Sequence, residues 1–265
     1  MVDRTVPRSL HAVGPPALAR VAFVLVNPSH PGNVGAAARA MKTMGLTDLR
    51  LVAPRHPDVL ERPDALALAS GARDLLAAAR VFPGLAPAIA DAVLAVAVSA
   101  EPREFGPAPL PPEHCAARAF DALARDPAHR VAFVFGAERT GLSIDQVQAC
   151  SLLASIPADP DYSSLNLAQA LQIVAYCVRR AALEPQAPPP SEDDDREPLA
   201  EQQAVQGLLA HLERVLALIG FLDPAHPKKL MPRLRRLLLR SRLRVEEVDL
   251  LRGVCTRIER HRNGP

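Results

Sequence analysis

The sequence has no tryptophan, and aromatic residues make up only 3% of its 265 positions. Proteins that bind single-stranded nucleic acid by base stacking rely on exposed aromatic rings, so this composition argues against that mode of binding. The four cysteines are scattered and contain no C-x-x-C pair. Their spacing indicates neither a zinc site nor a disulfide framework, and we expect a reduced, cytoplasmic protein.

Long apolar segments are also missing. No stretch approaches the roughly 20 apolar residues that cross a bilayer, and the N-terminus has no apolar run long enough for a signal peptide. Four histidines, His30, His56, His114 and His129, lack the spacing of metal ligands, so we expect each at the surface or in a helix cap. We therefore expect no membrane partner and no bound metal.

Hydrophobic residues make up 49% of the chain, which is enough to build a buried core. Strands that are apolar on both faces and alternate with helices predict an α/β domain whose mostly parallel sheet is covered on both faces. Short apolar runs predict strands at residues 21–26, 49–52, 92–98, 131–135 and 152–156. Helical spacing is found at residues 33–44, 64–70, 73–79, 116–124 and 165–183, and a capping box, Ser143 with Gln146, opens one further helix.

Composition divides the chain into four parts. We expect a flexible leader at residues 1–19, the α/β domain at 20–184, a Pro-rich and acidic linker at 185–199, and a helical extension at 200–265. Three helices are expected in the extension, at residues 200–219, 227–240 and 245–261.

The end of this extension is strongly basic. Residues 226–262 contain twelve Lys or Arg and four Asp or Glu, a net charge of +8, whereas the whole chain has +2. Such a segment can dock nucleic acid through its phosphates rather than its bases. A solvated helix face with ion pairs four residues apart would show a similar composition.

Three further segments could carry chemistry, and each follows or leads into a predicted element. Residues 31–39, Pro-Gly-Asn-Val-Gly-Ala-Ala-Ala-Arg, lie between the first strand and its helix, where glycines and free N–H groups suit an anionic ligand. The segment is neither a Walker loop nor a G-x-G-x-x-G motif, so a tight strand-to-helix turn explains it equally well. Taken alone, Arg39 could be a surface residue.

The other two segments come later in the chain. Residues 135–142, Phe-Gly-Ala-Glu-Arg-Thr-Gly-Leu, directly follow a buried strand, where open α/β sheets bind ligands, although a charged turn with an internal ion pair would also fit. Residues 162–170 pass from a loop into the last helix of the domain. We expect Ser163 or Ser164 to cap that helix, with Asn166 one step inside it.

Together the three segments resemble the SPOUT methyltransferases of the TrmH branch. The residues that carry the resemblance are Asn33-x-Gly35-x-x-x-Arg39, Phe135-Gly136-x-Glu138-x-x-Gly141-Leu142 and Ser163-Ser164-Leu165-Asn166-Leu167-Ala168. The surrounding sequence, over residues 20–262, is most similar to the bacterial TrmJ type. That type methylates the ribose 2'-hydroxyl of nucleotide 32 in the anticodon loop of tRNA.

The resemblance implies a C-terminal trefoil knot, a homodimer, tRNA as partner and S-adenosylmethionine as cofactor. Arg39, Ser164 and Asn166 would be catalytic. Because the guanidinium of an arginine stays protonated and cannot accept a proton, Arg39 would hold a phosphate or stabilise an alkoxide rather than act as a general base. The implied cofactor contacts are Val98, Ser99, Ala100, Gly136, Ile156, Ser163, Ser164 and Leu165. The implied RNA contacts are Asn33, Arg39, Glu138, Arg233, Arg235 and Arg236.

Other functions fit the same motifs. A 2'-O-methyltransferase of another tRNA position or of ribosomal RNA would share all three, and only the basic extension and the TrmJ-like sequence argue against it. A non-catalytic RNA-binding protein is a second alternative, but the motifs are intact. A base methyltransferase would need an acid or base near the acceptor, and no aspartate takes the place of Arg39.

Overall fold

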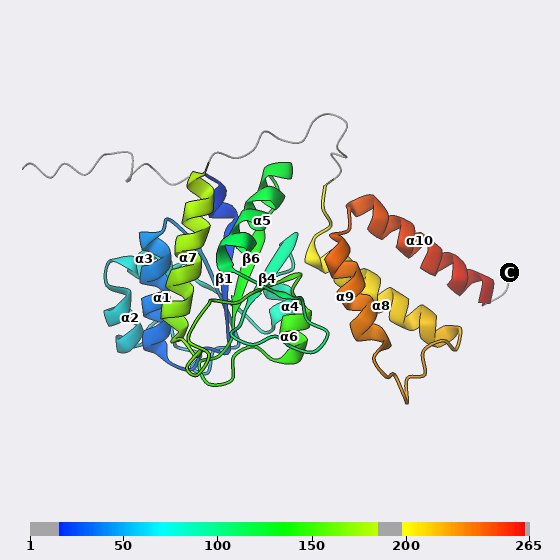
Figure 1. Ribbon diagram of the computed structural model, residues 1–265, viewed down its shortest axis with the longest axis horizontal. Helices are drawn as coiled ribbons and strands as arrows, with labels where there is room; N and C mark the ends of the chain where they lie inside the picture. Colours follow the sequence, from blue (N-terminus) through cyan, green and yellow to red (C-terminus); the bar gives the residue numbers. More distant parts are fainter. Residues whose placement is uncertain (1–15, 185–197, 263–265) are drawn as a thin grey trace, which may run out of the picture.

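The structure is a computed structural model and describes residues 16–184 and 198–262. A layered α/β body is followed by three helices that lie to its right in Figure 1. Most of the expected leader and linker, residues 1–15 and 185–197, lie outside the described residues. Residues 16–20, at the end of the expected leader, form a short 3-10 helix with Leu18 buried.

All strand pairs of the α/β body are parallel, as expected, and they form one seven-stranded sheet in the order β3-β2-β1-β6-β4-β7-β5. The strands are β1 (Val21–Val26), β2 (Asp48–Val52), β3 (Arg80–Phe82), β4 (Leu94–Val98), β5 (Pro109–Leu110), β6 (Val131–Phe135) and β7 (Leu152–Ala154). Five of them match the predicted strands. The two edge strands, β3 and β5, were not predicted because they are only three and two residues long and largely exposed.

Helices cover both faces of this sheet. The body contains α1 (Pro31–Thr43), α2 (Pro63–Ala69), α3 (Arg73–Ala77), α4 (Leu85–Ala88), α5 (Pro112–Arg125), α6 (Ile144–Gln148) and α7 (Leu167–Leu183). One face, with Phe23 and Leu25 of β1, is buried under α1, α5 and α7. The opposite face, with Ala22 and Val24, is buried in part under α4 and α6. The fully buried strands thus explain the continuous apolar runs of the sequence.

The extension consists of α8 (Gln202–Leu218), α9 (Leu230–Ser241) and α10 (Val245–Arg262) around a small core of its own. It is attached to the body by backbone and side-chain hydrogen bonds. The Gln202 amide donates to the Ala92 carbonyl at 2.8 Å, and the Leu199 amide donates to His129 Nε2 at 3.2 Å. Of the two places expected for His129, the surface is wrong, because its side chain is buried at this junction. Its Nδ1 lies 2.8 Å from the carbonyl oxygen of Ala122, in the last turn of α5, which is a contact expected of a helix cap.

Candidate active site

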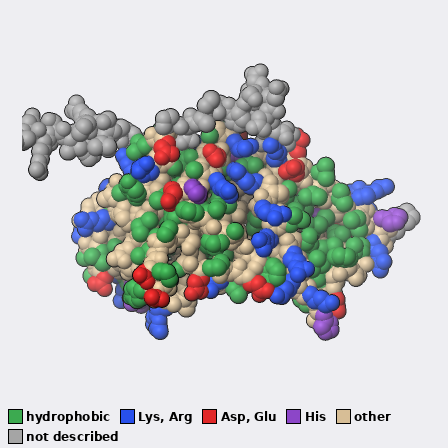
Figure 2. All heavy atoms as spheres, in the orientation of Figure 1, with side chains coloured by type: hydrophobic (Ala, Val, Ile, Leu, Met, Phe, Trp, Pro, Cys, Tyr) green, Lys and Arg blue, Asp and Glu red, His purple; other side chains and the backbone are tan. Residues whose placement is uncertain are grey.

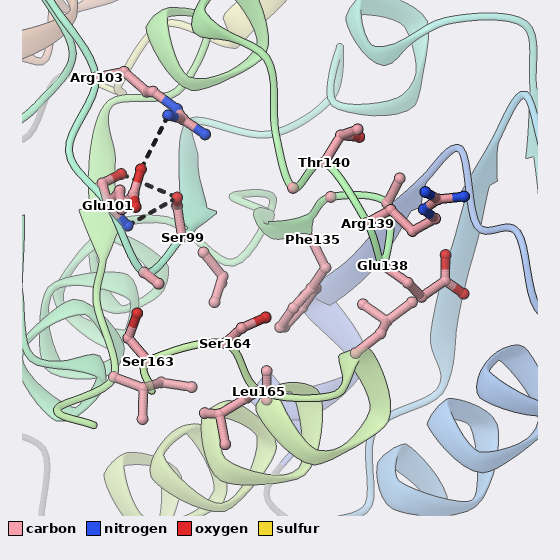
Figure 3. Close-up of a pocket in the computed structure, with 18 residues that line it drawn as sticks. Ser99, Glu101, Arg103, Phe135, Glu138, Arg139, Thr140, Ser163, Ser164 and Leu165 are labelled. Carbon is pink, nitrogen blue, oxygen red and sulfur yellow. Dashed lines mark hydrogen bonds and ion pairs between the residues drawn. The ribbon is translucent and has the colours of Figure 1, made fainter. Parts of the chain in front are cut away.

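A cavity of about 320 Å³ lies beyond the carboxyl ends of β4, β6 and β7. Its walls come from three loops and the start of α7 (Figure 3). The loops contribute residues 98–103, residues 135–141, and Ile156 with residues 163–165, and α7 contributes Leu167 and Ala170. Parallel strands bring their carboxyl ends to one edge of the sheet, and ligands of open α/β sheets bind at that edge. The cavity is thus where the strand pattern predicted a ligand.

All eight residues that the resemblance implied as cofactor contacts line this cavity. They are Val98, Ser99, Ala100, Gly136, Ile156, Ser163, Ser164 and Leu165. Ser99 and residues 163–165 lie around the cavity together with Phe135, which ends β6 (Figure 3). Residues from distant parts of the chain therefore meet at one place, and cofactor binding by them remains a prediction.

The glycines of the first two motifs allow close approach of backbone to backbone. A Cβ atom on Gly136 would lie 2.1 Å from the carbonyl carbon of Gly141, because residues 136–141 fold back on themselves. The Gly141 amide donates to the Ala137 carbonyl at 2.8 Å and closes this turn. A Cβ atom on Gly35 would lie 2.0 Å from the Ala65 carbonyl oxygen, so Gly35 lets α1 pack against α2 rather than against a ligand.

The carboxylate of Glu138 binds the segment that leads into α1. One oxygen accepts hydrogen bonds from the Ser29 amide at 2.9 Å and the Ser29 hydroxyl at 2.7 Å. The other accepts from the His30 amide at 3.1 Å and Asn33 Nδ2 at 3.0 Å. Burial would raise the pKa of Glu138, but the hydrogen bonds from Asn33 and Ser29 outweigh it and hold the pKa at about 2.

This arrangement decides between two interpretations of the second motif. No ion pair between Glu138 and Arg139 is found in the described part of the chain, so the alternative of a turn with an internal ion pair is wrong. Glu138, expected to contact RNA, has both oxygens occupied by Ser29, His30 and Asn33.

Asn33 joins the three motifs. Its Nδ2 donates to Glu138, and its Oδ1 accepts from Asn166 Nδ2 at 3.0 Å. Asn166 Oδ1 in turn accepts from the amides of Ala168 at 2.9 Å and Gln169 at 3.4 Å. A chain of side-chain hydrogen bonds therefore runs from the loop after β6, through α1, to the first turn of α7.

Asn166 is the N-cap of α7, so the expectation that Ser163 or Ser164 caps this helix is wrong. The backbone of Asn166 is non-helical, with φ −57° and ψ 144°, and the helix begins at Leu167. Asn166 is consequently not inside the helix, where it would be unfavourable, but at the position that asparagine prefers. Both serines are left to line the cavity.

Arg39 is not among the residues that line the cavity. It lies on α1 with an exposed side chain and has no hydrogen bond or ion pair to any described residue. Asn166 lies next to the cavity through its neighbour Leu165 but does not line it. Within one copy of the chain, the structure therefore does not bring the three expected catalytic residues to one point.

The three arginines expected to contact RNA differ in their surroundings. Arg233 and Arg236 are exposed on α9, and the guanidinium of Arg233 lies 6.0 Å from the ring centroid of Phe105. Arg235 is partly buried and donates to Gln206 Oε1 at 2.9 Å, so it also holds α9 against α8.

Two charged residues of the cavity, Glu101 and Arg103, lie outside every segment that the sequence pointed to. Arg103 donates to Glu101 at 3.4 Å, while its Nε is buried without a partner in the described chain. Glu101 and Arg103 lie within five residues of the end of β4, and that position is the signal that could have found them.

No helix in the described ranges is long and apolar enough to cross a membrane. Among those same residues, no group of three or more His, Cys, Asp or Glu side chains is arranged to hold a metal ion.

Comparison with known proteins identifies the class of this fold and site. The model of the SpoU rRNA Methylase family matches residues 20–176, which include all three motifs. The chain therefore belongs to the SpoU methylase family, a family of methyltransferases. A second model, described as the C-terminal domain of the tRNA methyltransferase TrmJ, matches residues 203–265.

Individual relatives agree with both matches. A protein of Yersinia pestis (strain Pestoides F) named tRNA (cytidine/uridine-2'-O-)-methyltransferase TrmJ is 44% identical over 252 residues, which cover 94% of this chain and 95% of that protein. The protein of the same name from Salmonella typhimurium is 41% identical over 93% of this chain and 99% of its own length. The resemblance drawn from the motifs is thereby confirmed.

Solved structures extend the similarity to the fold. The crystal structure of TrmJ from Z. mobilis ZM4 has a TM-score of 0.76 and 36% sequence identity, and covers 90% of this chain and 99% of that one. A probable methyltransferase from Bordetella pertussis is 49% identical with a TM-score of 0.60, over 63% of this chain and 98% of its own.

Proposed function

We propose that this protein transfers a methyl group from S-adenosylmethionine to the ribose 2'-hydroxyl of cytidine or uridine at nucleotide 32 of tRNA. The second and third motifs line one cavity, and the first motif is hydrogen-bonded to both of them through Asn33; this arrangement carries the proposal. The names and the extent of the TrmJ relatives support the substrate. We expect the reaction to take place in the cytoplasm.

The cavity suits this cofactor in size and lining. Its volume of about 320 Å³ is at the lower end of the range of roughly 300–1,000 Å³ for small-molecule sites. Apolar walls from Phe135, Ile156 and Leu165 can hold a flat heterocycle, while Arg103, whose Nε is buried without a partner, can bind a carboxylate. The eight residues implied by the resemblance would hold the cofactor, which supplies an already activated methyl group.

The residues of the chain then have to align the ribose hydroxyl with the methyl donor and stabilise the charge that develops on its oxygen. Ser164 lines the cavity, and Asn166 is fixed by Asn33 beside it, so both are placed to position the ribose near the donor. Such alignment can supply a large share of a rate enhancement. Arg39 would hold the neighbouring phosphate or stabilise the developing alkoxide, because a guanidinium stays protonated.

We propose further that Arg39 acts in the site of a second copy, in a homodimer. Two observations support this: Arg39 is unpaired and outside the cavity of its own chain, and α7, which packs against α1, exposes Ile173 and Tyr176. Mixing Arg39→Ala and Gly136→Ala subunits tests the idea. Random mixing should restore about a quarter of the activity, since half the dimers are mixed and each contains one complete site. Two inactive variants that stay inactive after mixing would contradict it.

The knot and the domain boundaries belong to the same proposal. β6 enters the sheet between β1 and β4, and β7 enters between β4 and β5, so the chain returns to the interior of the sheet after reaching its edge. This order supports a trefoil knot in the C-terminal half of the α/β domain. The two family models, at residues 20–176 and 203–265, support a methyltransferase domain at 20–184, a linker at 185–199 and an extension at 200–265.

Ribose-methylation mapping of tRNA from a strain that lacks this protein tests the activity. Loss of the mark at nucleotide 32, with rescue by the wild type but not by Arg39→Ala, is the expected result. Because the matching family is described by ribosomal RNA methylation, ribosomal RNA from the same strain is the second substrate to map. A mark lost there, with tRNA unchanged, would favour the alternative function.

Arg39→Ala should reduce single-turnover methylation far more than it reduces cofactor affinity in calorimetry. This expectation follows because Arg39 does not line the cofactor cavity of its own chain. Equal losses in both measurements would contradict the role given to Arg39.

A further inference from the structure

A second, smaller cavity lies at the junction of the α/β body and the helical extension. Its volume is about 80 Å³, and its lining consists of Leu94, Arg118, Ser151, Leu152, Leu239, Arg240 and Arg242. Leu94 and Leu152 begin β4 and β7, so this cavity lies at the amino ends of strands whose carboxyl ends border the first cavity. The two sites are therefore on opposite edges of the sheet.

Three arginines line this cavity, and none of them is in an ion pair with another described residue. Arg118 comes from α5, Arg240 from α9 and Arg242 from the C-cap of α9. None of them forms a hydrogen bond or ion pair with another described residue, and Nη2 of Arg242 is buried with no partner. A buried donor without an acceptor costs free energy, so each such group in a native protein calls for an explanation.

The surroundings of Arg242 oppose its positive charge. Burial, and then the charges of Arg125 and Arg118, lower its pKa, while Asp121 is the acidic residue that acts in the other direction. An anion placed among these guanidinium groups would relieve the repulsion and satisfy the orphan donor.

The backbone of Arg242 is strained as well. It has φ 54° and ψ 58°, in the left-handed region, at a helix C-cap where glycine is preferred. This conformation is unfavourable for a residue that has a Cβ atom. Strained residues that keep an unsatisfied polar group are found at ligand sites more than elsewhere.

We propose that this cavity binds one phosphate group and, resting on the proposed function, that this group belongs to the sugar–phosphate backbone of the tRNA. The guanidinium forks of the three arginines match a tetrahedral oxyanion. The Ser151 hydroxyl, which accepts from Gln202 Nε2 at 3.1 Å, keeps its own proton to donate.

The size and setting of the cavity favour a phosphate within a polymer. The volume of about 80 Å³ is small beside the roughly 300–1,000 Å³ of small-molecule sites, so the cavity suits a single phosphate group better than a whole nucleotide. Arg118 and Arg240 are exposed and lead out of the cavity to the surface. Figure 2 shows Lys and Arg side chains gathered between the α/β body and the extension, and such a basic surface suits a polymer that carries several phosphates.

The test uses Arg242→Gly in the full-length protein, because glycine removes the guanidinium and relieves the strained backbone. The matched control is Arg73→Gln, which removes an exposed and unpaired arginine of α3, far from the junction in Figure 1. Thermal unfolding is measured in sodium phosphate and in sodium chloride of equal ionic strength. Phosphate stabilises folded proteins in general by exclusion from their surface, so the readout is the difference between the proteins. The wild type and Arg73→Gln should gain more stability in phosphate than Arg242→Gly, and Arg242→Gly should unfold no earlier than the wild type in chloride.

Binding of tRNA by fluorescence anisotropy identifies the source of the phosphate. Arg242→Gly should bind about tenfold more weakly than Arg73→Gln, which corresponds to one charge-assisted contact, with a salt slope smaller by about one. If phosphate stabilises the wild type and Arg73→Gln more than Arg242→Gly, but both variants bind tRNA with equal affinity, the tRNA assignment is overturned in favour of free phosphate. Equal stabilisation of all three proteins would overturn the site itself.

Methyl transfer by the wild type is measured separately. If it fails while the phosphate result holds, the proposed function is wrong and the anion site stands. If it succeeds while Arg242→Gly behaves like the control, only the anion site is wrong.

Discussion

Replacing Glu138 with glutamine should weaken the link between the first two motifs without changing the size of the side chain. Each carboxylate oxygen of Glu138 accepts two hydrogen bonds. The amide of glutamine keeps one oxygen that can accept hydrogen bonds. Its NH2 group replaces the other oxygen and faces two N–H or O–H donors with which it cannot bond. Hydrogen bonds to a charged group contribute about 1.5–3 kcal/mol each when buried, and because this site is partly exposed, we expect Glu138→Gln to lower the free energy of unfolding by about 2–3 kcal/mol.

The loss should depend on pH in a defined direction. The pKa of Glu138 is about 2 in the folded chain and 4.5 ordinarily, so its carboxylate stabilises the fold fully above pH 4.5 and loses this contribution as pH falls toward 2. The difference in unfolding free energy between wild type and Glu138→Gln should therefore be constant from pH 7 to about 5.5 and then shrink.

Urea denaturation at several pH values between 7 and 3 measures this difference. Glu61→Gln is the control, because Glu61 is exposed and its side chain has no partner in the described chain. A difference below about 0.5 kcal/mol at pH 7, or one that stays constant down to pH 3, would refute the role given to Glu138.

Three further predictions concern other parts of the fold. Gly136→Ala places a Cβ 2.1 Å from backbone, so calorimetry should show cofactor affinity falling at least about tenfold; Gly71→Ala, with nothing within 4 Å, should bind normally. The pKa of Asp48 is about 2 despite burial because Arg50, Arg80 and Arg130 donate hydrogen bonds to its carboxylate. Asp48→Asn should therefore lower the free energy of unfolding by about 2 kcal/mol in urea denaturation at pH 7, and by progressively less below pH 4. His129→Ala should cost about 2 kcal/mol in the same assay by leaving the Leu199 amide unpaired, and an unchanged midpoint would contradict this.

The layered fold could be predicted because most of its strands are visible in the sequence as short, continuous apolar runs. Buried parallel strands need apolar residues on both faces, and the runs at Val21–Val26 and Val131–Phe135 have no other simple explanation. The edge strands could not be found, since Pro109–Leu110 forms only through its pairing with β7. The order of the strands is a tertiary property that no local pattern contains.

The site was predictable to the same extent. Strand ends are local features, and parallel strands must bring them together, so the residues of the first cavity could be expected to meet. The N-cap could not be chosen, because Ser163, Ser164 and Asn166 are all good caps and the hydrogen bond from Asn166 to Asn33 decides between them. The anion cavity forms where α9 lies beside the starts of β4 and β7, and no sequence motif predicts that arrangement.

The position of β6 in the sheet has a consequence for how the protein folds during its synthesis. Val21 of β1, the first of the described strands, pairs with Val131 of β6, so more than a hundred residues must be synthesised before β1 has its inner neighbour. Until then the nascent sheet presents an apolar, unpaired edge on the ribosome. Contacts so distant in sequence slow folding and favour aggregation of the incomplete chain. Production of this protein should accordingly benefit from low temperature and abundant chaperones, and refolding from denaturant should be slow.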